Sequence, residues 1–361
     1  MSVPQISSAH FNGDNVVRSL LKWVGSKLKL THILAPAIID ELAAMQGRSV
    51  GSRLQYIEPF AGTGIVGLSV LGAMVKILGD TSNESDLPEF HFFDKNAALV
   101  EFMNVVTLFQ SFAEDDISAY NSESSMEVKS EMFLKWRGDF NRLNAGYASG
   151  VNERRAVLFW LLNQAGFNGL YRVNGSGIYN VPFGKRVKLP VLCQGSEFYS
   201  RREQLRLVLN SNLCRGFKNI PRYTGIDSYV GATAWDTHVT SPESTFVYCD
   251  PPYMTGEGKE NAHTAYTAGG WSQFDLNTLC WSLMRLHHEG MRWMLSNSDA
   301  IIPLIDRLFG ETLGKELFVY KIDVRRSVAA NAQARGETCE VIITNFDSDF
   351  LRTTCEVVTR N

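Results

Sequence analysis

The sequence contains no hydrophobic run long enough to cross a membrane. A spanning helix needs about 20 consecutive apolar residues, whereas the longest apolar stretch, Ile65–Leu78, is shorter and is interrupted by Lys76. The first 23 residues carry no apolar segment followed by small residues, which is the pattern of a secretory signal. We therefore expect a cytoplasmic protein rather than a membrane protein or a secreted one.

Metal-binding patterns are scarce as well. The six cysteines form no C-x-x-C pair, and no two of the seven histidines are four residues apart. Zinc sites use such close spacings, and disulfide frameworks belong to small secreted chains. We expect a reduced protein that holds no metal ion.

Neither sign of charge is in large excess. The chain has 35 Lys and Arg against 38 Asp and Glu, a formal charge of −3, which excludes a histone-like polycation. Residues 135–222, however, hold 15 basic and 4 acidic side chains, so the rest of the chain is acidic. This basic segment indicates an anionic partner such as nucleic acid, with an ordinary solvated helical surface as the alternative.

The order of the apolar segments is typical of an α/β protein. With 361 residues and 45% apolar content the chain can bury a large core. Short apolar runs alternate with helical patterns, which predicts a mostly parallel sheet covered on both faces. The expected strands are 54–59, 90–93, 246–249, 292–295, 317–324 and 339–344, and the expected helices are 65–78, 276–287 and 300–309.

The centre of the chain has a different pattern. A helix is predicted over Glu153–Ala165, and the β-prone runs Leu170–Val173 and Ile178–Val181 flank Asn174-Gly175-Ser176-Gly177. Such a turn between two short strands indicates a β-hairpin. The polar stretch Ala113–Ser125 is expected to be a loop.

Two features suit a nucleotide-like ligand. The segment Glu58–Gly64 places two glycines at a strand-to-helix junction, where the backbone can pass close to a bound cofactor. Asp94 ends the next strand, at the position where an acidic side chain accepts ribose hydroxyls in nucleotide-binding folds. A glycine turn without a ligand and an aspartate that caps a helix are the alternatives.

The tetrapeptide Asp250–Tyr253, Asp-Pro-Pro-Tyr, follows the apolar run 246–249. Two prolines fix the backbone and remove two N–H donors, so carbonyl oxygens dominate this edge. The oxygens suit the hydrogens of an exocyclic amine, while the aromatic ring suits the face of a planar base. A structural Asp-Pro turn is the alternative.

Together these motifs resemble the Dam family of DNA adenine-N6 methyltransferases (D12 class, alpha group), in which the cofactor signature precedes the catalytic one. Ser26 departs from that family, which usually has a second glycine there, and the chain has apparent insertions near residues 40–53, 79–88, 112–150 and 198–245. Further motifs that match in order are Lys22–Lys27 (K-W-V-G-S-K), Glu153–Lys185, Tyr266, Phe274, Leu295–Asp299 and Val324–Ser327.

The resemblance implies a seven-stranded Rossmann-like class I methyltransferase sheet with an inserted helical and β-hairpin DNA-recognition domain. Residues 1–96 and 193–361 would form the catalytic domain, and residues 97–192 the recognition domain. It also implies S-adenosylmethionine as the methyl donor. By similarity the cofactor-binding residues are Trp23, Lys27, Phe60, Gly62, Gly64, Asp94 and Asp250, and the catalytic residues are Asp250, Pro251, Pro252 and Tyr253.

The same resemblance implies double-stranded DNA as the partner, an adenine flipped out of the duplex, and GATC or a GAT-containing target. By similarity the DNA-binding residues are Lys22, Phe167, Asn168, Leu170, Arg172, Pro182 and Arg326. We expect a monomer or a weak dimer. A cognate restriction endonuclease, a phage role and a solitary role stay open, as do two other functions: an RNA adenine methyltransferase and a non-catalytic DNA-binding regulator.

Overall fold

The structure, a computed structural model, describes most of the 361 residues. The described ranges are 6–48, 52–79, 84–107, 113–145, 152–191, 193–220, 242–253, 271–314, 316–322 and 339–358, without the side chains of residues 85 and 311–314. No helix within these ranges is long and apolar enough to cross a membrane.

A single mixed sheet organises the fold, with strand order β3-β2-β1-β4-β5-β7-β6-β8. The first five strands in this order are parallel, and β7 runs antiparallel to both of its neighbours, β5 and β6. The strands are β1 Gln55–Pro59, β2 Glu89–Asp94, β3 Cys214–Asn219, β4 Thr245–Cys249, β5 Arg292–Ser298, β6 Phe318–Ile322, β7 Glu340–Thr344 and β8 Glu356–Val357. The mostly parallel α/β sheet expected from the sequence is confirmed.

The expected number of seven strands is wrong, because the sheet has eight. The additional strand is β8, which pairs antiparallel with β6 through Tyr320 opposite Val357 and Lys321 opposite Glu356. An edge strand presents unpaired N–H and C=O groups, and the end of the chain satisfies part of that edge here. Its two residues are too short to give a recognisable sequence pattern.

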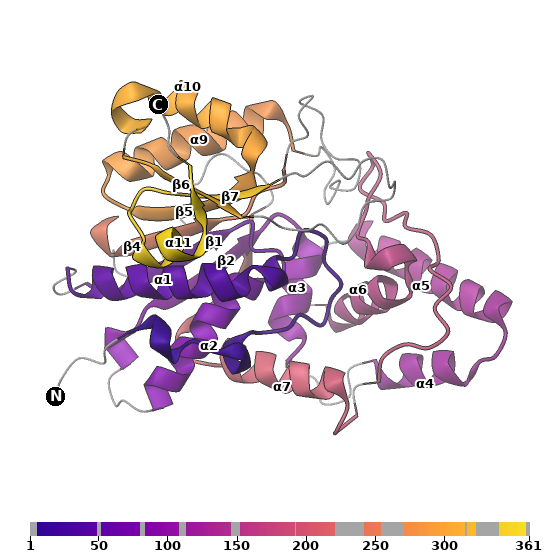
Figure 1. Cartoon of the computed structure of the whole chain (residues 1–361). Coiled ribbons are helices and arrows are strands. Elements are labelled where there is room, and N and C mark those ends of the chain that lie inside the picture. The colour runs from indigo at the N-terminus through magenta and orange to yellow at the C-terminus, as the bar shows by residue number, and fades with distance from the viewer. Residues whose placement is uncertain are drawn as a thin grey trace.

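Helices cover both faces of the sheet, and α9 and α10 lie on the opposite side from α1 and α2 (Figure 1). Successive side chains of a strand point to opposite faces of the sheet, so Tyr56 packs in the hydrophobic cluster on one face and Ile57 in the cluster on the other. The helices of the α/β part are α1 Thr31–Gln46, α2 Ile65–Gly79, α3 Ala97–Val105, α7 Glu197–Leu209, α9 Gln273–His288, α10 Ile302–Gly314 and α11 Asp349–Thr354.

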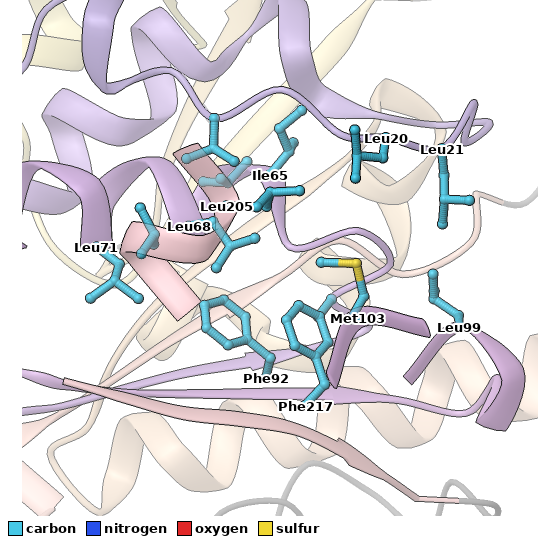
Figure 2. Close-up of a cluster of buried hydrophobic side chains, with 14 of the residues drawn as sticks. Leu20, Leu21, Ile65, Leu68, Leu71, Phe92, Leu99, Met103, Leu205 and Phe217 are labelled. Carbon is cyan, nitrogen blue, oxygen red and sulfur yellow. The ribbon is translucent and has the colours of Figure 1, made fainter. Parts of the chain in front are cut away.

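Leucine side chains of α2 and α7 lie close to two stacked rings of the sheet (Figure 2). The rings of Phe92 and Phe217, from the neighbouring strands β2 and β3, lie parallel with centroids 4.8 Å apart. Leu68 of α2 and Leu205 of α7 are buried in the same cluster. Each such side chain stabilises the fold by about 1.5–3 kcal/mol relative to an exposed position. This layer holds the start of α2 against the sheet.

The central segment forms the helices α4 Glu114–Ser122, α5 Met126–Ala145 and α6 Glu153–Ala165. The bounds of α6 agree with the prediction. The loop expected over Ala113–Ser125 is wrong, because most of it forms α4. Tyr120 of α4 is fully buried against Trp136 of α5, whose Nε1 donates to Asp116 at 3.0 Å. Tertiary packing therefore makes this polar stretch helical.

The predicted hairpin is present after α6. Asn174 N donates to Ile178 O at 2.9 Å and Asn180 N donates to Arg172 O at 3.2 Å, which closes the turn that contains Gly177. A separate recognition domain over residues 97–192 stays a prediction. Within that range, α3 joins the sheet through Asn104, whose side chain bonds to the backbone of Phe217 in β3.

Candidate active site

The predicted motifs meet where the strand order reverses. Strand β1 lies between β2 and β4, with Pro59 opposite Phe93 and Ile57 opposite Val247. All three strands are parallel, so the segments that follow them emerge at the same edge of the sheet. In open α/β sheets this position is the usual ligand-binding crevice.

The turn after β1 needs glycine twice. Gly62 and Gly64 have φ of +53° and +64°, a region that side chains disfavour. A Cβ on Gly64 would lie 2.8 Å from Phe217 Cζ, and one on Gly62 would lie 3.1 Å from Trp23 Nε1. Phe60 also has a positive φ, of 62°, and its ring meets Trp271 edge-on at 5.3 Å. The turn therefore lies directly against Trp23, a predicted site residue, and against β3, a strand that the sequence analysis did not predict.

Asp94 fastens this turn to β2. Its Oδ2 accepts from Gly62 N at 2.8 Å, and its Oδ1 accepts from Asn96 N at 2.7 Å. Burial raises the pKa of the Asp94 carboxyl, and the backbone N–H donors oppose that rise. The cap of α3 is Asn96, which accepts from Leu99 N at 3.1 Å, so Asp94 is not the capping residue. Each carboxylate oxygen keeps acceptor capacity for a ligand hydroxyl.

Lys27 and Asp250 form a buried ion pair across the crevice. Lys27 Nζ lies 2.8 Å from Asp250 Oδ1, and the lysine side chain is 7% exposed, which rules out a solvated surface lysine. Its two other contacts are Gly25 O at 3.1 Å and Glu340 Oε1 at 3.2 Å. An ammonium has three N–H donors, and this set provides an acceptor for each of them.

Burial is the main influence on Asp250 and raises the pKa of its carboxyl to about 6; Lys27 opposes the rise and Glu340 adds to it. For Lys27, burial disfavours the charge, but Asp250 and Glu340 together hold the pKa of the ammonium above its usual value. The pair therefore keeps a carboxylate in a nearly dry site at neutral pH.

Tyr253 completes the cluster. Its hydroxyl donates to Glu340 Oε1 at 2.6 Å, and its ring centroid is 4.8 Å from Lys27 Nζ. Burial raises the pKa of Tyr253 well above its usual value, so the phenol stays neutral and remains a donor. An acidic group, an ammonium and an aromatic ring thus converge at the end of β4.

A sequence model of the D12 class N6 adenine-specific DNA methyltransferases matches residues 23–220 and 232–324 of this chain. These matches cover most of its length. The chain belongs to this family.

Curated relatives of this methyltransferase extend over most of its length. A type II methyltransferase, M.MjaIII of Methanocaldococcus jannaschii, is 29% identical over 91% of this chain and 99% of its own. The DNA adenine methylase of Serratia marcescens is 27% identical over 90% of this chain and 97% of its own. A second type II methyltransferase, M1.LlaDCHI of Lactococcus lactis subsp. cremoris, is 33% identical over 54% of this chain and 59% of its own.

The residues predicted to contact DNA gather on and beside the hairpin of the methyltransferase. Phe167 N donates to Pro182 O at 3.0 Å, and Phe167 is 50% exposed, so it is not a hairpin core residue. Lys22 lies against Gly169, where a Cβ would come within 2.5 Å of Lys22 Cβ. Those on this surface are Lys22, Phe167, Asn168, Leu170, Arg172 and Pro182; Leu170 is half-buried and the other five are exposed. Arg326 and Tyr266 lie outside the described residues.

Two residues that contact the candidate site were missed by the sequence analysis. Glu340 begins β7, and because β7 is antiparallel to β5, its first residue lies at the carboxyl edge of the parallel strands. An acidic residue at the start of an antiparallel neighbour was the signal that could have identified it. Asn163 of α6 bonds to both the N–H and the C=O of Lys22, and only tertiary structure brings these segments together.

Proposed function

We propose that this methyltransferase transfers the methyl group of S-adenosylmethionine to N6 of an adenine flipped out of duplex DNA, at GATC or a GAT-containing site. The observation that carries the proposal is the meeting of the glycine turn, Asp94 and Asp250–Tyr253 at the edge where the strand order reverses. The type II names of two relatives support a role beside a restriction endonuclease of the same specificity.

The donor side of the site is the turn after β1. Donor binding supplies an activated methyl group on a sulfonium sulfur. Gly62 lets the turn pass directly against Trp23, because a Cβ there would lie 3.1 Å from Trp23 Nε1, and the turn and the indole together face the donor. Asp94 accepts the ribose hydroxyls, while Phe60 and Gly64 shape the turn. Lys27 neutralises the carboxylate of the donor once it exchanges one of its present partners.

The acceptor side is the Asp-Pro-Pro-Tyr corner. The adenine amine is a weak nucleophile because its lone pair is delocalised into the ring. Asp250 and the Pro251 carbonyl accept its two hydrogens and stabilise the positive charge that develops on nitrogen. Pro252 keeps the corner rigid, and Tyr253 stacks on the flipped base. In this direct transfer the N6–CH3 bond forms as the S–CH3 bond breaks, S-adenosylhomocysteine leaves, and one N6 proton passes to Asp250 or to water, so no covalent enzyme intermediate is needed.

The hairpin side of the site recognises the DNA bases around the target adenine. Arg172 makes a bidentate contact with guanine, and Leu170 and Pro182 pack against a thymine methyl. Phe167 fills the space left by the flipped adenine, with Lys22 and Asn168 beside it. Arg326 contacts a phosphate, and the basic segment 135–222 adds salt-dependent affinity for the DNA backbone.

Methyl transfer from tritiated S-adenosylmethionine tests this function directly. The wild-type protein is given unmethylated duplexes with one GATC site, matched duplexes without it, and RNA of the same sequence. We expect label on N6 of adenine in the GATC duplex, and the variant Asp250→Ala abolishes transfer while S-adenosylhomocysteine still binds. Label on RNA alone, or donor binding without any transfer by the wild type, contradicts the proposal.

A further inference from the structure

Glu340 contacts two of the residues that carry the proposed reaction. Its Oε1 lies 3.2 Å from Lys27 Nζ and accepts from the Tyr253 hydroxyl at 2.6 Å. The side chain is 16% exposed and lies opposite Ser298 of β5, so the sheet fixes its position. The Glu340 carboxylate therefore influences the positions of both the Tyr253 ring and the Lys27 ammonium, which is the ion-pair partner of Asp250.

Asp250 has a competing partner in the present arrangement. Its Oδ1 bonds to Lys27 at 2.8 Å, and an adenine amine that bonds to the same carboxylate weakens the hold of Asp250 on Lys27. Lys27 is too deeply buried to give up Asp250 without another counter-charge, because an isolated buried ammonium is strongly unfavourable. The donor carboxylate proposed above for Lys27 is one such counter-charge, and Glu340 is the one that the protein itself holds within reach of the same nitrogen.

We infer that Glu340 is a positioning residue of the transfer site, which retains Lys27 when Asp250 turns to the adenine amine and fixes the Tyr253 ring through its hydroxyl. The inference rests on the proposed function, since it concerns the same reacting groups. Glu340 itself does not touch the substrate; it acts through Lys27 and Tyr253.

The role of Glu340 can be measured through the pKa of Asp250, which depends on the charges around it. Among the described residues, the titratable groups that face it are Lys27, Glu340, Tyr253, Glu58, Tyr248 and Cys249. Burial raises the pKa of Glu58 to about 8, and burial also holds the pKa values of Tyr248 and Cys249 well above their usual values. Near neutral pH, the charges that act on Asp250 within this described set are therefore those of Lys27 and Glu340.

The variants Glu340→Gln and Tyr253→Phe test the charge of Glu340 and its bond to the ring separately. Glu340 raises the pKa of Asp250, whereas the one hydroxyl hydrogen of Tyr253 is donated to Glu340. Loss of the glutamate charge therefore moves the acid limb of the kcat/KM profile to lower pH, by about half a pH unit or more. We also expect each variant to lower the plateau rate about 10-fold or more, since Tyr253 loses its anchor.

The test is the pH dependence of kcat/KM for methyl transfer from S-adenosylmethionine to unmethylated duplex DNA, which reports groups of the free enzyme. Glu356→Gln is the matched control, because it removes one exposed carboxylate from β8 of the same sheet and leaves the limb at the wild-type pH. A downward shift of the limb in Glu340→Gln, together with a lowered plateau in both site variants, supports the inference.

An unmoved or upward-shifted limb in Glu340→Gln overturns the inference while leaving the proposed function intact. If that variant does not fold, the plateau rate of Tyr253→Phe decides alone, because this variant removes the bond between the ring and Glu340, and a wild-type plateau there overturns the inference. Absence of transfer by the wild-type protein overturns the proposed function itself, and the inference with it. A merely structural role of Glu340 lowers the plateau of Glu340→Gln without moving the acid limb of that variant.

Discussion

Arg172 illustrates how a single side chain is prepared for recognition. It lies exposed on the hairpin, and its Nε donates to Asn180 Oδ1 at 2.8 Å. This bond fixes the plane of the guanidinium, while Nη2 has only a long contact of 3.4 Å with Asn180 O. A held guanidinium loses less entropy when it forms paired bonds to a base edge. The side chain therefore suits a base contact more than a diffuse phosphate contact.

Arg172→Ala should reduce discrimination at one base pair of the target by about 1–3 kcal/mol, because a bidentate base contact is lost. The measurement compares kcat/KM on duplexes that carry each substitution of the target. Lys188→Ala is the control, since it removes an exposed charge of the same basic segment away from the hairpin. An equal loss on all sequences in Arg172→Ala would identify a phosphate contact instead.

Helix α6 joins the two sides of the site at the scale of whole elements. Asn163, 2% exposed, accepts from Lys22 N at 2.9 Å and donates to Lys22 O and Gly169 O at 2.8 Å each. The segment after Lys22 leads to Trp23 and Lys27, and Gly169 opens the hairpin. The rings of Trp23 and Tyr171 lie 6.3 Å apart along the same boundary. The segment proposed to bind the donor and the hairpin proposed to bind DNA thus share one buried amide, that of Asn163.

Asn163→Ala should lower the free energy of unfolding by about 1–3 kcal/mol, since it leaves buried backbone groups of Lys22 without their partner. We expect affinity for S-adenosylmethionine and discrimination between target sequences to fall together, because both elements shift. Urea unfolding, calorimetric binding and transfer assays measure the three effects. Gln164→Ala is the control, as its side chain reaches only Leu20 O and Asn163. A stability loss without either functional loss contradicts the shared role.

Buried carboxyl groups give the whole molecule a pH-dependent stability. Burial raises the pKa of Glu58 to about 8 and that of Asp250 to about 6, so the folded state binds protons that the unfolded chain releases. Burial opposes ionisation of Glu89 too, but bonds from His91, Arg215 and Gln55 hold the pKa of Glu89 well below its usual value. The raised pKa values of Glu58 and Asp250 therefore lower the free energy of unfolding as pH increases. The lowered pKa of Glu89 lowers the free energy of unfolding as pH falls.

The urea midpoint of the wild-type protein should therefore be highest near about pH 5 and decline towards pH 8. Glu58→Gln keeps the size of the side chain and does not ionise, so we expect a flatter decline, with a gain on the order of 1–3 kcal/mol at pH 8. The exposed variant Glu356→Gln should follow the wild-type curve. A midpoint of Glu58→Gln that declines as steeply as the wild type would show that Glu58 is not the group responsible.

Local patterns were sufficient for much of this protein. The alternation of strands and helices predicted a parallel sheet, and α6 and the hairpin around Gly177 follow from helix and turn residues that act over a few positions. The same reasoning failed for α4, where burial of Tyr120 against Trp136 decides the conformation. It also missed β8, whose two residues form a strand only because β6 offers an open edge.

The sequence by itself determined which residues have the chemistry for the site: the glycines after β1, Asp94, and Asp250–Tyr253. Short motifs carry that information, since backbone conformation and functional groups depend on neighbouring residues. Only the tertiary structure decided that Glu340 and Asn163 belong to the site. Both act on residues more than a hundred positions away, Lys27 and Lys22 respectively, and the pairing of β7 with β5 and the packing of α6 bring them there.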